Sequence, residues 1–192
     1  VESNQIIMRI ISGKLKGKSI NFSKSKKTRP LKDSVKENIF NILAHSNLIK
    51  VKLEKSNILD LYSGIGSFGI ECISRGARKI TFVEKDKNIV QILNKNLLDL
   101  SIQDQAKVET DNIINFLNKK HHLKFEIIFL DPPFIDENYV EELRVINEQK
   151  IYKKNHIIIL HRESTSPNSF EKIINPLIIK EYGRSKIVFG RF

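Results

Sequence analysis

Residues 58–69 have the sequence ILDLYSGIGSFG, an apolar run followed by closely spaced glycines. The apolar run predicts a buried β-strand, and the residues from Ser67 onward predict a helix. Gly64, Gly66 and Gly69 therefore match the pattern G-x-G-x-x-G in the strand–turn–helix context that nucleotide-binding folds require. Glycines in such a loop allow the backbone to approach a ligand closely. The stretch predicts a nucleotide-like ligand at the carboxyl end of this strand.

Strand and helix patterns alternate along the chain after this loop. Strands are expected at residues 58–62, 79–84, around 108, 125–130 and 156–161. Helices are expected at residues 67–75, 87–100, 113–119 and 138–146. The chain closes with two strands, at 177–182 and 186–192, that predict an antiparallel hairpin. This order predicts an α/β protein with a doubly wound, mostly parallel sheet and an antiparallel edge.

The N-terminal segment, residues 1–31, is expected to form a basic extension to the main domain at residues 32–192. Strand patterns at Met8–Ile11 and 18–22 flank Gly13 and Gly17 and predict a β-hairpin, with Met8 as a possible natural start. Ser34 is followed three residues later by Glu37, which predicts a capping box at the start of the first helix of the main domain. Gly76 is expected to end the helix at residues 67–75.

The distribution of charge favours a polyanionic partner. The chain has 192 residues and a formal net charge of +11. A segment without acidic residues carries the basic side chains Arg9, Lys14, Lys16, Lys18, Lys24, Lys26, Lys27 and Arg29. We expect this segment to contact phosphates, in RNA or DNA equally, and the alternative is a solvated basic arm.

Composition excludes several classes of protein. The single cysteine, Cys72, excludes an internal disulfide and gives no zinc-binding pattern, and its helical context predicts that it is buried. No metal site is expected. No apolar stretch approaches the ~20 residues that span a bilayer, and no signal peptide pattern opens the chain. We expect a cytoplasmic protein with no membrane partner.

The tetrapeptide Asp131-Pro132-Pro133-Phe134 directly follows the expected strand at 125–130. Proline has no N–H, so the Pro132 carbonyl and the Asp131 carboxylate can direct two acceptors at one NH2 group. Phe134 offers a flat face on which a planar base can stack. The motif predicts a catalytic site that acts on the exocyclic amine of a nucleobase, with the base flipped out if it is paired.

The acidic residues at the strand ends distinguish a methyl donor from a dinucleotide. Glu84 ends the second expected strand and suits the two ribose hydroxyls. Asp60 lies beside the glycine loop, where a carboxylate would repel a pyrophosphate but suits an ammonium or a sulfonium. Asp111 and Asn112 follow the third strand, where an adenine amino group would lie, although a helix cap is the alternative for both. With Tyr62 as a pocket-lining aromatic, these residues favour S-adenosyl-L-methionine over NAD.

The chain resembles the RsmD family of bacterial 16S ribosomal RNA guanine-N2 methyltransferases. The resemblance rests on residues 9–18, residues 28–40, the cofactor segment at 60–77 and Asp131–Phe134, and it covers nearly the whole chain from Met8. It implies a Rossmann-like class I methyltransferase fold with a seven-stranded, mostly parallel sheet. It also implies S-adenosyl-L-methionine as cofactor and a guanine of 16S ribosomal RNA in the small subunit as substrate. Leu31 and Lys36 depart from the residues that the family usually has.

Several functional assignments follow from the motifs and the resemblance together. Substrate binding is expected from Arg29 and from the hairpin lysines Lys14, Lys16 and Lys18. We expect a monomer. His161 ends the fifth strand but has no evident partner in the sequence, so it is interpreted as structural. The alternatives are a DNA adenine-N6 or other amino-nitrogen methyltransferase, and a non-catalytic RNA-binding assembly factor.

Overall fold

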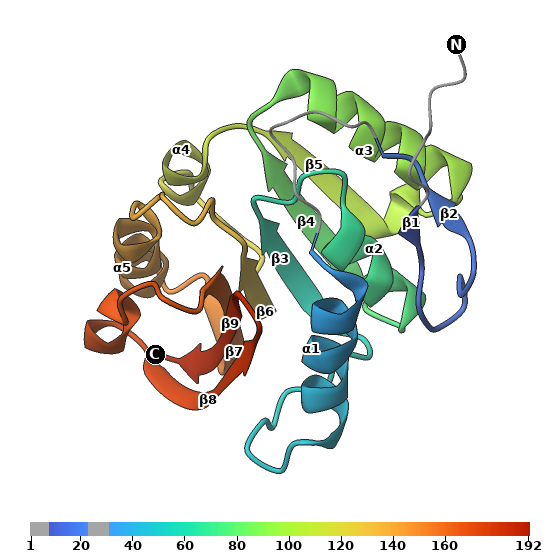
Figure 1. Ribbon diagram of the computed structural model, residues 1–192. Coiled ribbons are helices and arrows are strands. Elements are labelled where there is room, and N and C mark those ends of the chain that lie inside the picture. Colours follow the sequence, from blue (N-terminus) through green and yellow to red (C-terminus); the bar gives the residue numbers. More distant parts are fainter. Residues whose placement is uncertain (1–7, 23–30) are drawn as a thin grey trace.

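The computed structural model describes residues 8–22 and 31–192 (Figure 1). Its main sheet has seven strands in the order β5-β4-β3-β6-β7-β9-β8. The strands are β3 (Asn57–Leu61), β4 (Lys79–Glu84), β5 (Ala106–Thr110), β6 (Phe125–Leu130), β7 (Tyr152–Glu163), β8 (Asn175–Tyr182) and β9 (Ser185–Arg191). The helices are α1 (Asp33–His45), α2 (Ser67–Ser74), α3 (Lys87–Asp99), α4 (Ile113–Leu117) and α5 (Tyr139–Gln149), with 3-10 turns at Gln103–Gln105 and Ser169–Lys172. β3 to β7 are parallel to one another, and β9 pairs antiparallel with both β7 and β8. The sheet has the predicted architecture.

The order in which the strands are added to the sheet reverses after β5, and the switch point lies between the neighbouring strands β3 and β6. From β3 the chain proceeds outward through β4 to β5, and then returns to β6 on the other side of β3. In an open α/β sheet the loops at the carboxyl ends of two such strands diverge and leave a crevice that binds ligands. The glycine loop follows β3 and Asp131 follows β6, so both predicted motifs lie at this crevice.

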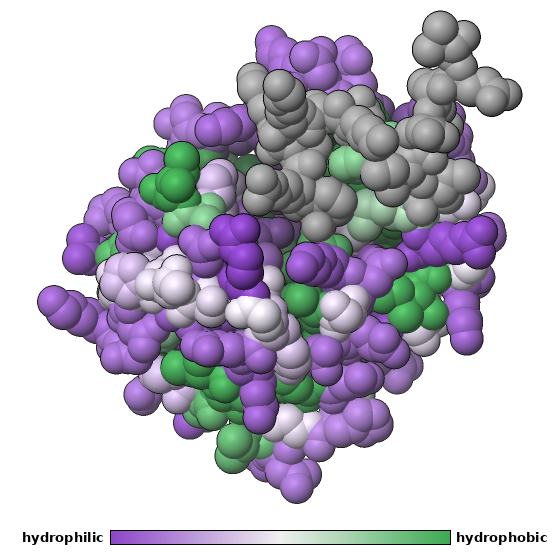
Figure 2. Space-filling view, in the orientation of Figure 1, coloured by the Kyte–Doolittle hydropathy of each residue, from purple (hydrophilic) through white to green (hydrophobic). Residues whose placement is uncertain are grey.

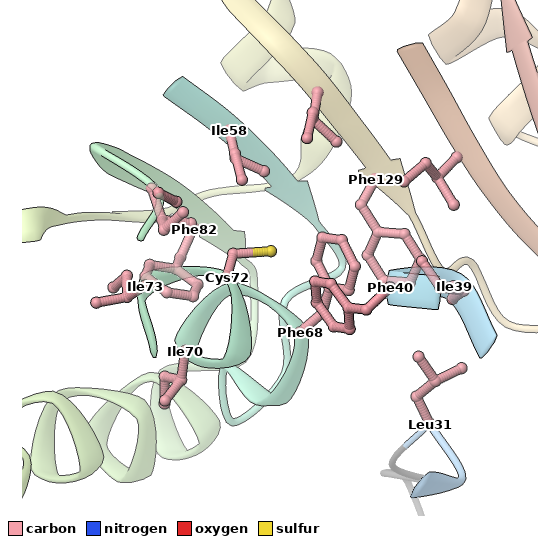
Figure 3. Close-up of a cluster of buried hydrophobic side chains, with 14 of the residues drawn as sticks. Leu31, Ile39, Phe40, Ile58, Phe68, Ile70, Cys72, Ile73, Phe82 and Phe129 are labelled. Carbon is pink, nitrogen blue, oxygen red and sulfur yellow. The ribbon is translucent and has the colours of Figure 1, made fainter. Parts of the chain in front are cut away.

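Each face of the sheet has its own hydrophobic core. α1, α2 and α3 pack on one face, and α4 and α5 pack on the other (Figure 1). In the first core the Phe68 ring stacks on Phe129 of β6 at 3.9 Å and on Phe40 of α1 at 5.4 Å, and Cys72 lies beside them, buried as predicted (Figure 3). Residues 127–130 of β6 alternate between the two cores, which explains why this part of the strand is continuously apolar.

The N-terminal hairpin has β1 (Met8–Arg9) and β2 (Ser19–Ile20), as predicted, and it packs against α2. The buried Glu71 carboxylate accepts hydrogen bonds from the backbone N–H groups of Ile11 and Ser12, at 2.9 and 3.0 Å. The Ser74 hydroxyl accepts a further bond from the Leu15 N–H at 3.0 Å. A buried carboxylate that binds backbone donors is expensive to leave unpaired, so these bonds fix the hairpin to the helix.

Several element boundaries differ from the sequence-based prediction, most clearly those of α1 and β7. α1 begins at Asp33, with Lys32 as its N-cap residue and no side-chain cap. The Ser34–Glu37 capping box is therefore wrong, because the Lys36 N–H already bonds to the Lys32 carbonyl and Ser34 lies inside the first turn. Gly76 follows the C-cap of α2 with φ +96°, as predicted. β7 begins four residues earlier than the expected strand at 156–161 and ends two residues later.

Within residues 8–22 and 31–192, no helix is long and apolar enough to cross a membrane.

Two glycines of the N-terminal hairpin give a matched test of its attachment to α2. A Cβ on Gly13, where φ is +83°, would lie 2.0 Å from the Ser74 carbonyl oxygen, whereas a Cβ on Gly17, at φ +82°, would meet nothing within 4 Å. We expect Gly17→Ala to lower the free energy of unfolding by about 1 kcal/mol through backbone strain alone. We expect Gly13→Ala to cost about 3 kcal/mol or more, because a close-packed contact must also open. Urea denaturation measures both, and equal losses would contradict the docking.

Candidate active site

The glycine loop connects β3 to α2 and has the backbone conformation that its glycines permit. Gly64 and Gly66 have φ of +54° and +88°, in the left-handed region that favours glycine. Gly69 is needed for a different reason, because a Cβ there would lie 2.2 Å from the Phe82 ring of β4. The third glycine thus allows the helix to pack closely on the sheet, as expected for this motif.

Two of the predicted cofactor-binding acids hold this loop in the free protein. Glu84 accepts hydrogen bonds from the Gly64 N–H at 3.0 Å and from the Asp86 N–H at 2.9 Å. Asp60 is buried and accepts a bond from the Gly69 N–H at 3.0 Å. Burial raises the pKa of Asp60 well above its usual range, the Gly69 bond opposes that rise, and the negative charges of Asp131 and Glu84 add to it. Asp60 therefore lies beneath the loop, held to the start of α2 by this bond.

A cavity of about 310 Å³ opens beside the loop and brings together four of the predicted cofactor residues. Its lining contains Tyr62, Glu84, Asp111 and Asn112 together with Val83, Lys85, Ile113, Ile114, Asp136, Asn138 and Glu142. Asp60, Gly64 and Gly66 are not among the lining residues. A shallower hollow of about 350 Å³ lies between α1 and β8, but none of the motif residues line it. The cavity at the sheet edge is therefore the candidate ligand site.

The helix-cap alternative for Asp111 and Asn112 is partly correct. The Asn112 side chain accepts a bond from the Asn115 N–H at 2.8 Å and so caps α4. Asp111 forms an ion pair with Lys119 at 2.8 Å and accepts a bond from the Asn115 side chain at 3.3 Å. The hydrogen bond from Lys119 lowers the pKa of Asp111. Both residues still line the cavity, so capping does not remove them from the site.

Tyr62 and Glu142 form a pair at the wall of the cavity that the sequence patterns did not predict. Tyr62 has φ +62°, an unusual conformation for a non-glycine residue, and its hydroxyl donates to one oxygen of the buried Glu142 carboxylate at 2.7 Å. The other Glu142 oxygen has no partner among the described residues. Burial raises the pKa of Glu142 to about 7, with a further rise from Asp136 and an opposing effect of the Tyr62 bond. Burial and the Glu142 bond also raise the pKa of Tyr62.

Asp131 contacts His161, a residue that was expected to have no partner. Its carboxylate lies 2.7 Å from Nδ1 of His161, whose Nε2 lies 3.0 Å from the Ser185 hydroxyl. The Phe134 ring packs edge-on against His161, with 5.4 Å between ring centres. The expectation that His161 has no partner was therefore wrong, whereas its interpretation as a structural residue stays a prediction. Strand register is the signal that could have identified it, since Leu130 pairs with Leu160 and the next residues are Asp131 and His161.

The neighbouring residue, Arg162, holds the backbone of the motif. Its buried guanidinium donates to the carbonyl oxygens of Pro133 at 3.0 Å and Phe134 at 2.8 Å, and to the Glu137 carboxylate at 2.8 Å. The Pro132 carbonyl is different, because no described residue donates to it. Among the described residues, the neighbouring carbonyls of Pro133 and Phe134 thus have donors and that of Pro132 has none.

The expected substrate-binding residues lie apart from the cavity or outside the described residues. Lys14, Lys16 and Lys18 are exposed on the N-terminal hairpin, and the Lys14 ammonium donates to the Gln105 side chain at 2.6 Å. Arg29 lies outside the residues that the structure describes. The face of the molecule seen in Figure 2 is largely hydrophilic, with separate hydrophobic patches.

The raised pKa of Glu142 predicts a pH-dependent stability. The usual pKa of 4.5 applies to the unfolded chain and about 7 to the folded one, so the folded state binds more protons between these values. Stability should therefore fall by about 2–3 kcal/mol as the pH rises from 4.5 through 7. Glu142→Gln should remove this pH dependence of the free energy of unfolding. The control is Glu141→Gln, which changes the exposed neighbouring residue. Urea denaturation at pH 5 and pH 8 measures the slopes, and identical slopes for wild type and Glu142→Gln would contradict the prediction.

The chain is similar to known proteins over most of its length. The family model described as Conserved hypothetical protein 95 matches residues 8–191. Ribosomal RNA small subunit methyltransferase D of Haemophilus influenzae is 34% identical over 162 residues, covering 83% of this chain and 81% of that protein. The protein of the same name from Buchnera aphidicola subsp. Baizongia pistaciae is 32% identical over 189 residues, covering 96% of this chain and 91% of that protein.

The solved structure of yhhF from Escherichia coli, described as a methyltransferase, superposes with a TM-score of 0.80 at 26% identity. The match covers 96% of this chain and 97% of that one. The predicted class I methyltransferase fold is thereby confirmed. With the family model matching almost every described residue, the chain belongs to the RsmD family, that of ribosomal RNA small subunit methyltransferase D.

Proposed function

We propose that this protein transfers a methyl group from S-adenosyl-L-methionine to the exocyclic N2 amine of one guanine in 16S ribosomal RNA of the small subunit. Methylation of ribosomal RNA is the activity that its family membership supports. The choice of guanine N2 rests on the family resemblance, and one observation carries the proposed action on an exocyclic amine. Asp131 lies at the carboxyl end of β6, beside the glycine loop, and the adjacent Pro132 carbonyl receives no hydrogen bond from any described residue.

The cavity beside the glycine loop suits a cationic methyl donor better than a phosphate-bearing nucleotide. Its lining includes four carboxylates, those of Glu84, Asp111, Asp136 and Glu142, and one lysine, Lys85. Such a lining repels a pyrophosphate and attracts a positive ligand. S-adenosyl-L-methionine, when bound, supplies a methyl group made electrophilic by a sulfonium.

We assign the ribose, the adenine and the amino-acid part of S-adenosyl-L-methionine to the residues that line or support this cavity. Glu84 accepts hydrogen bonds from the ribose hydroxyls, and Asp111 and Asn112 recognise the adenine edge. Tyr62 lines the pocket. Gly64 and Gly66 let the backbone approach the amino-acid part, and Asp60 supports the loop beneath them through its hydrogen bond from the Gly69 N–H.

The tetrapeptide Asp131–Phe134, here called the DPPF motif, activates the acceptor amine. The lone pair of an amine on guanine is delocalised into the ring, so the nitrogen is a weak nucleophile. The Asp131 carboxylate and the Pro132 carbonyl accept its two hydrogens and favour a pyramidal nitrogen whose lone pair faces the methyl group. The ring of Phe134 stacks on the base, and Pro133 keeps the loop rigid. Catalysis is then mostly positioning and electrostatic stabilisation by preorganised groups.

The N-terminal extension, residues 1–31, is proposed to bind the RNA backbone. Lys14, Lys16 and Lys18 are exposed on a hairpin that is fixed to α2, and the net charge of the chain is +11. Phosphate contacts of this kind contribute affinity without sequence specificity. We propose that Arg29 contacts the target base or a phosphate near it, and that the protein acts as a monomer in the cytoplasm.

Identification of the methylated nucleoside tests the proposal. The protein is incubated with labelled S-adenosyl-L-methionine and, separately, naked 16S ribosomal RNA, unmodified small subunits and duplex DNA. Digestion and chromatography then identify the labelled nucleoside. We expect N2-methylguanosine from RNA or subunits and no label in DNA. Label on adenine, or in DNA alone, would overturn the proposal, and no label in any substrate would favour a binding protein without activity.

A further inference from the structure

We propose that His161 is a positioning residue for methyl transfer, which fixes one oxygen of Asp131 so that the other faces the acceptor amine. The inference rests on the proposed function, since it assigns a role within the same site. It starts from a chain of two contacts, Ser185 to His161 at 3.0 Å and His161 to Asp131 at 2.7 Å.

The contacts determine the tautomer of His161. An ionised Asp131 carboxylate can only accept hydrogen bonds, so Nδ1 of His161 carries the hydrogen that lies between them. Nε2 of a neutral imidazole is then an acceptor, and the Ser185 hydroxyl donates to it. Ser185 begins β9 and pairs with Glu163 of β7, so its position is set by the sheet. The imidazole is therefore held from both sides, and 93% of the surface of His161 is buried.

This arrangement leaves one carboxylate oxygen for the substrate. Oδ1 of Asp131 receives the Nδ1–H of His161, whereas no described residue donates to Oδ2. Without His161 the Asp131 carboxylate can rotate about its Cβ–Cγ bond. Binding of the amine then has to fix that rotation, which costs conformational entropy. Preorganisation of acceptors before substrate binds is a major source of catalysis in water-excluded sites.

His161 and Arg162 divide the task of holding the motif. Successive residues of a strand point to opposite faces of the sheet. His161 contacts the Asp131 side chain, whereas Arg162 contacts the carbonyls of Pro133 and Phe134. A substitution of His161 should therefore release the carboxylate while Arg162 still holds the backbone of the motif.

Three variants test the role of His161. We expect His161→Ala to lower the single-turnover rate of RNA methylation about 10- to 100-fold, as is usual for residues that orient a functional side chain. Affinity for S-adenosyl-L-homocysteine, measured by calorimetry, and the KM for RNA should stay within about twofold, since positioning acts on the chemical step. Ser185→Ala should lower the rate less.

His161→Asn distinguishes positioning from packing. The asparagine amide can donate a hydrogen bond to Asp131 but fills less space than an imidazole, so it should restore most of the rate lost in His161→Ala. The control is His122→Ala, which removes an exposed histidine.

The inference is overturned if His161→Ala retains the wild-type rate, if His161→Asn is as slow as His161→Ala, or if donor affinity falls in parallel with the rate. An inactive wild-type protein would instead refute the proposed function, so the two failures are distinguishable. Should His161→Ala unfold, the Asn and Ser185→Ala variants decide the question alone.

Discussion

The buried guanidinium of Arg162 determines the conformation of the loop on which the proposed chemistry depends. Burial of a charge is costly unless hydrogen bonds replace the lost water. The terminal nitrogens of Arg162 donate hydrogen bonds to the carbonyls of Pro133 and Phe134 and to Glu137, whereas Nε has no partner among the described residues. The guanidinium carbon also lies 4.4 Å from the centre of the Tyr139 ring, in a cation–π contact. Because prolines at 132 and 133 can donate no backbone hydrogen bonds, an external donor is needed to hold this segment. The result is a rigid turn in which the carbonyls of Pro133 and Phe134 are bound and that of Pro132 faces no described donor.

The two halves of the site are joined by a second polar contact. Tyr62 lies in the glycine loop after β3, and Glu142 lies in α5, the helix that follows the DPPF motif. Their hydrogen bond links the segment proposed to bind the donor to the segment that positions the acceptor. A buried carboxylate with one oxygen unpaired is a costly feature, and such features concentrate at functional sites. The geometry places this feature at the wall of the candidate donor cavity.

The sequence predicted those parts of the molecule whose causes are local or periodic. The glycine loop, the order of strands and helices, and the DPPF motif each depend on residues within a few positions of one another. His161 and Arg162 could not be identified in that way, because their partners lie 24 to 30 residues away and depend on strand register. The same holds for Glu142, which lies 80 residues from Tyr62. The prediction of a capping box was wrong for a different reason, since Lys32 is the N-cap residue of α1 and Ser34 lies inside its first turn.

The central claim is that Asp131 acts on the acceptor amine and not on the donor. Its most direct test is Asp131→Ala, with single-turnover methylation of small-subunit RNA measured beside calorimetric binding of S-adenosyl-L-homocysteine. The account predicts that the rate falls by about 100- to 1000-fold or more, while donor affinity changes by less than about threefold. Equal losses of rate and donor affinity, or an unchanged rate, would contradict it.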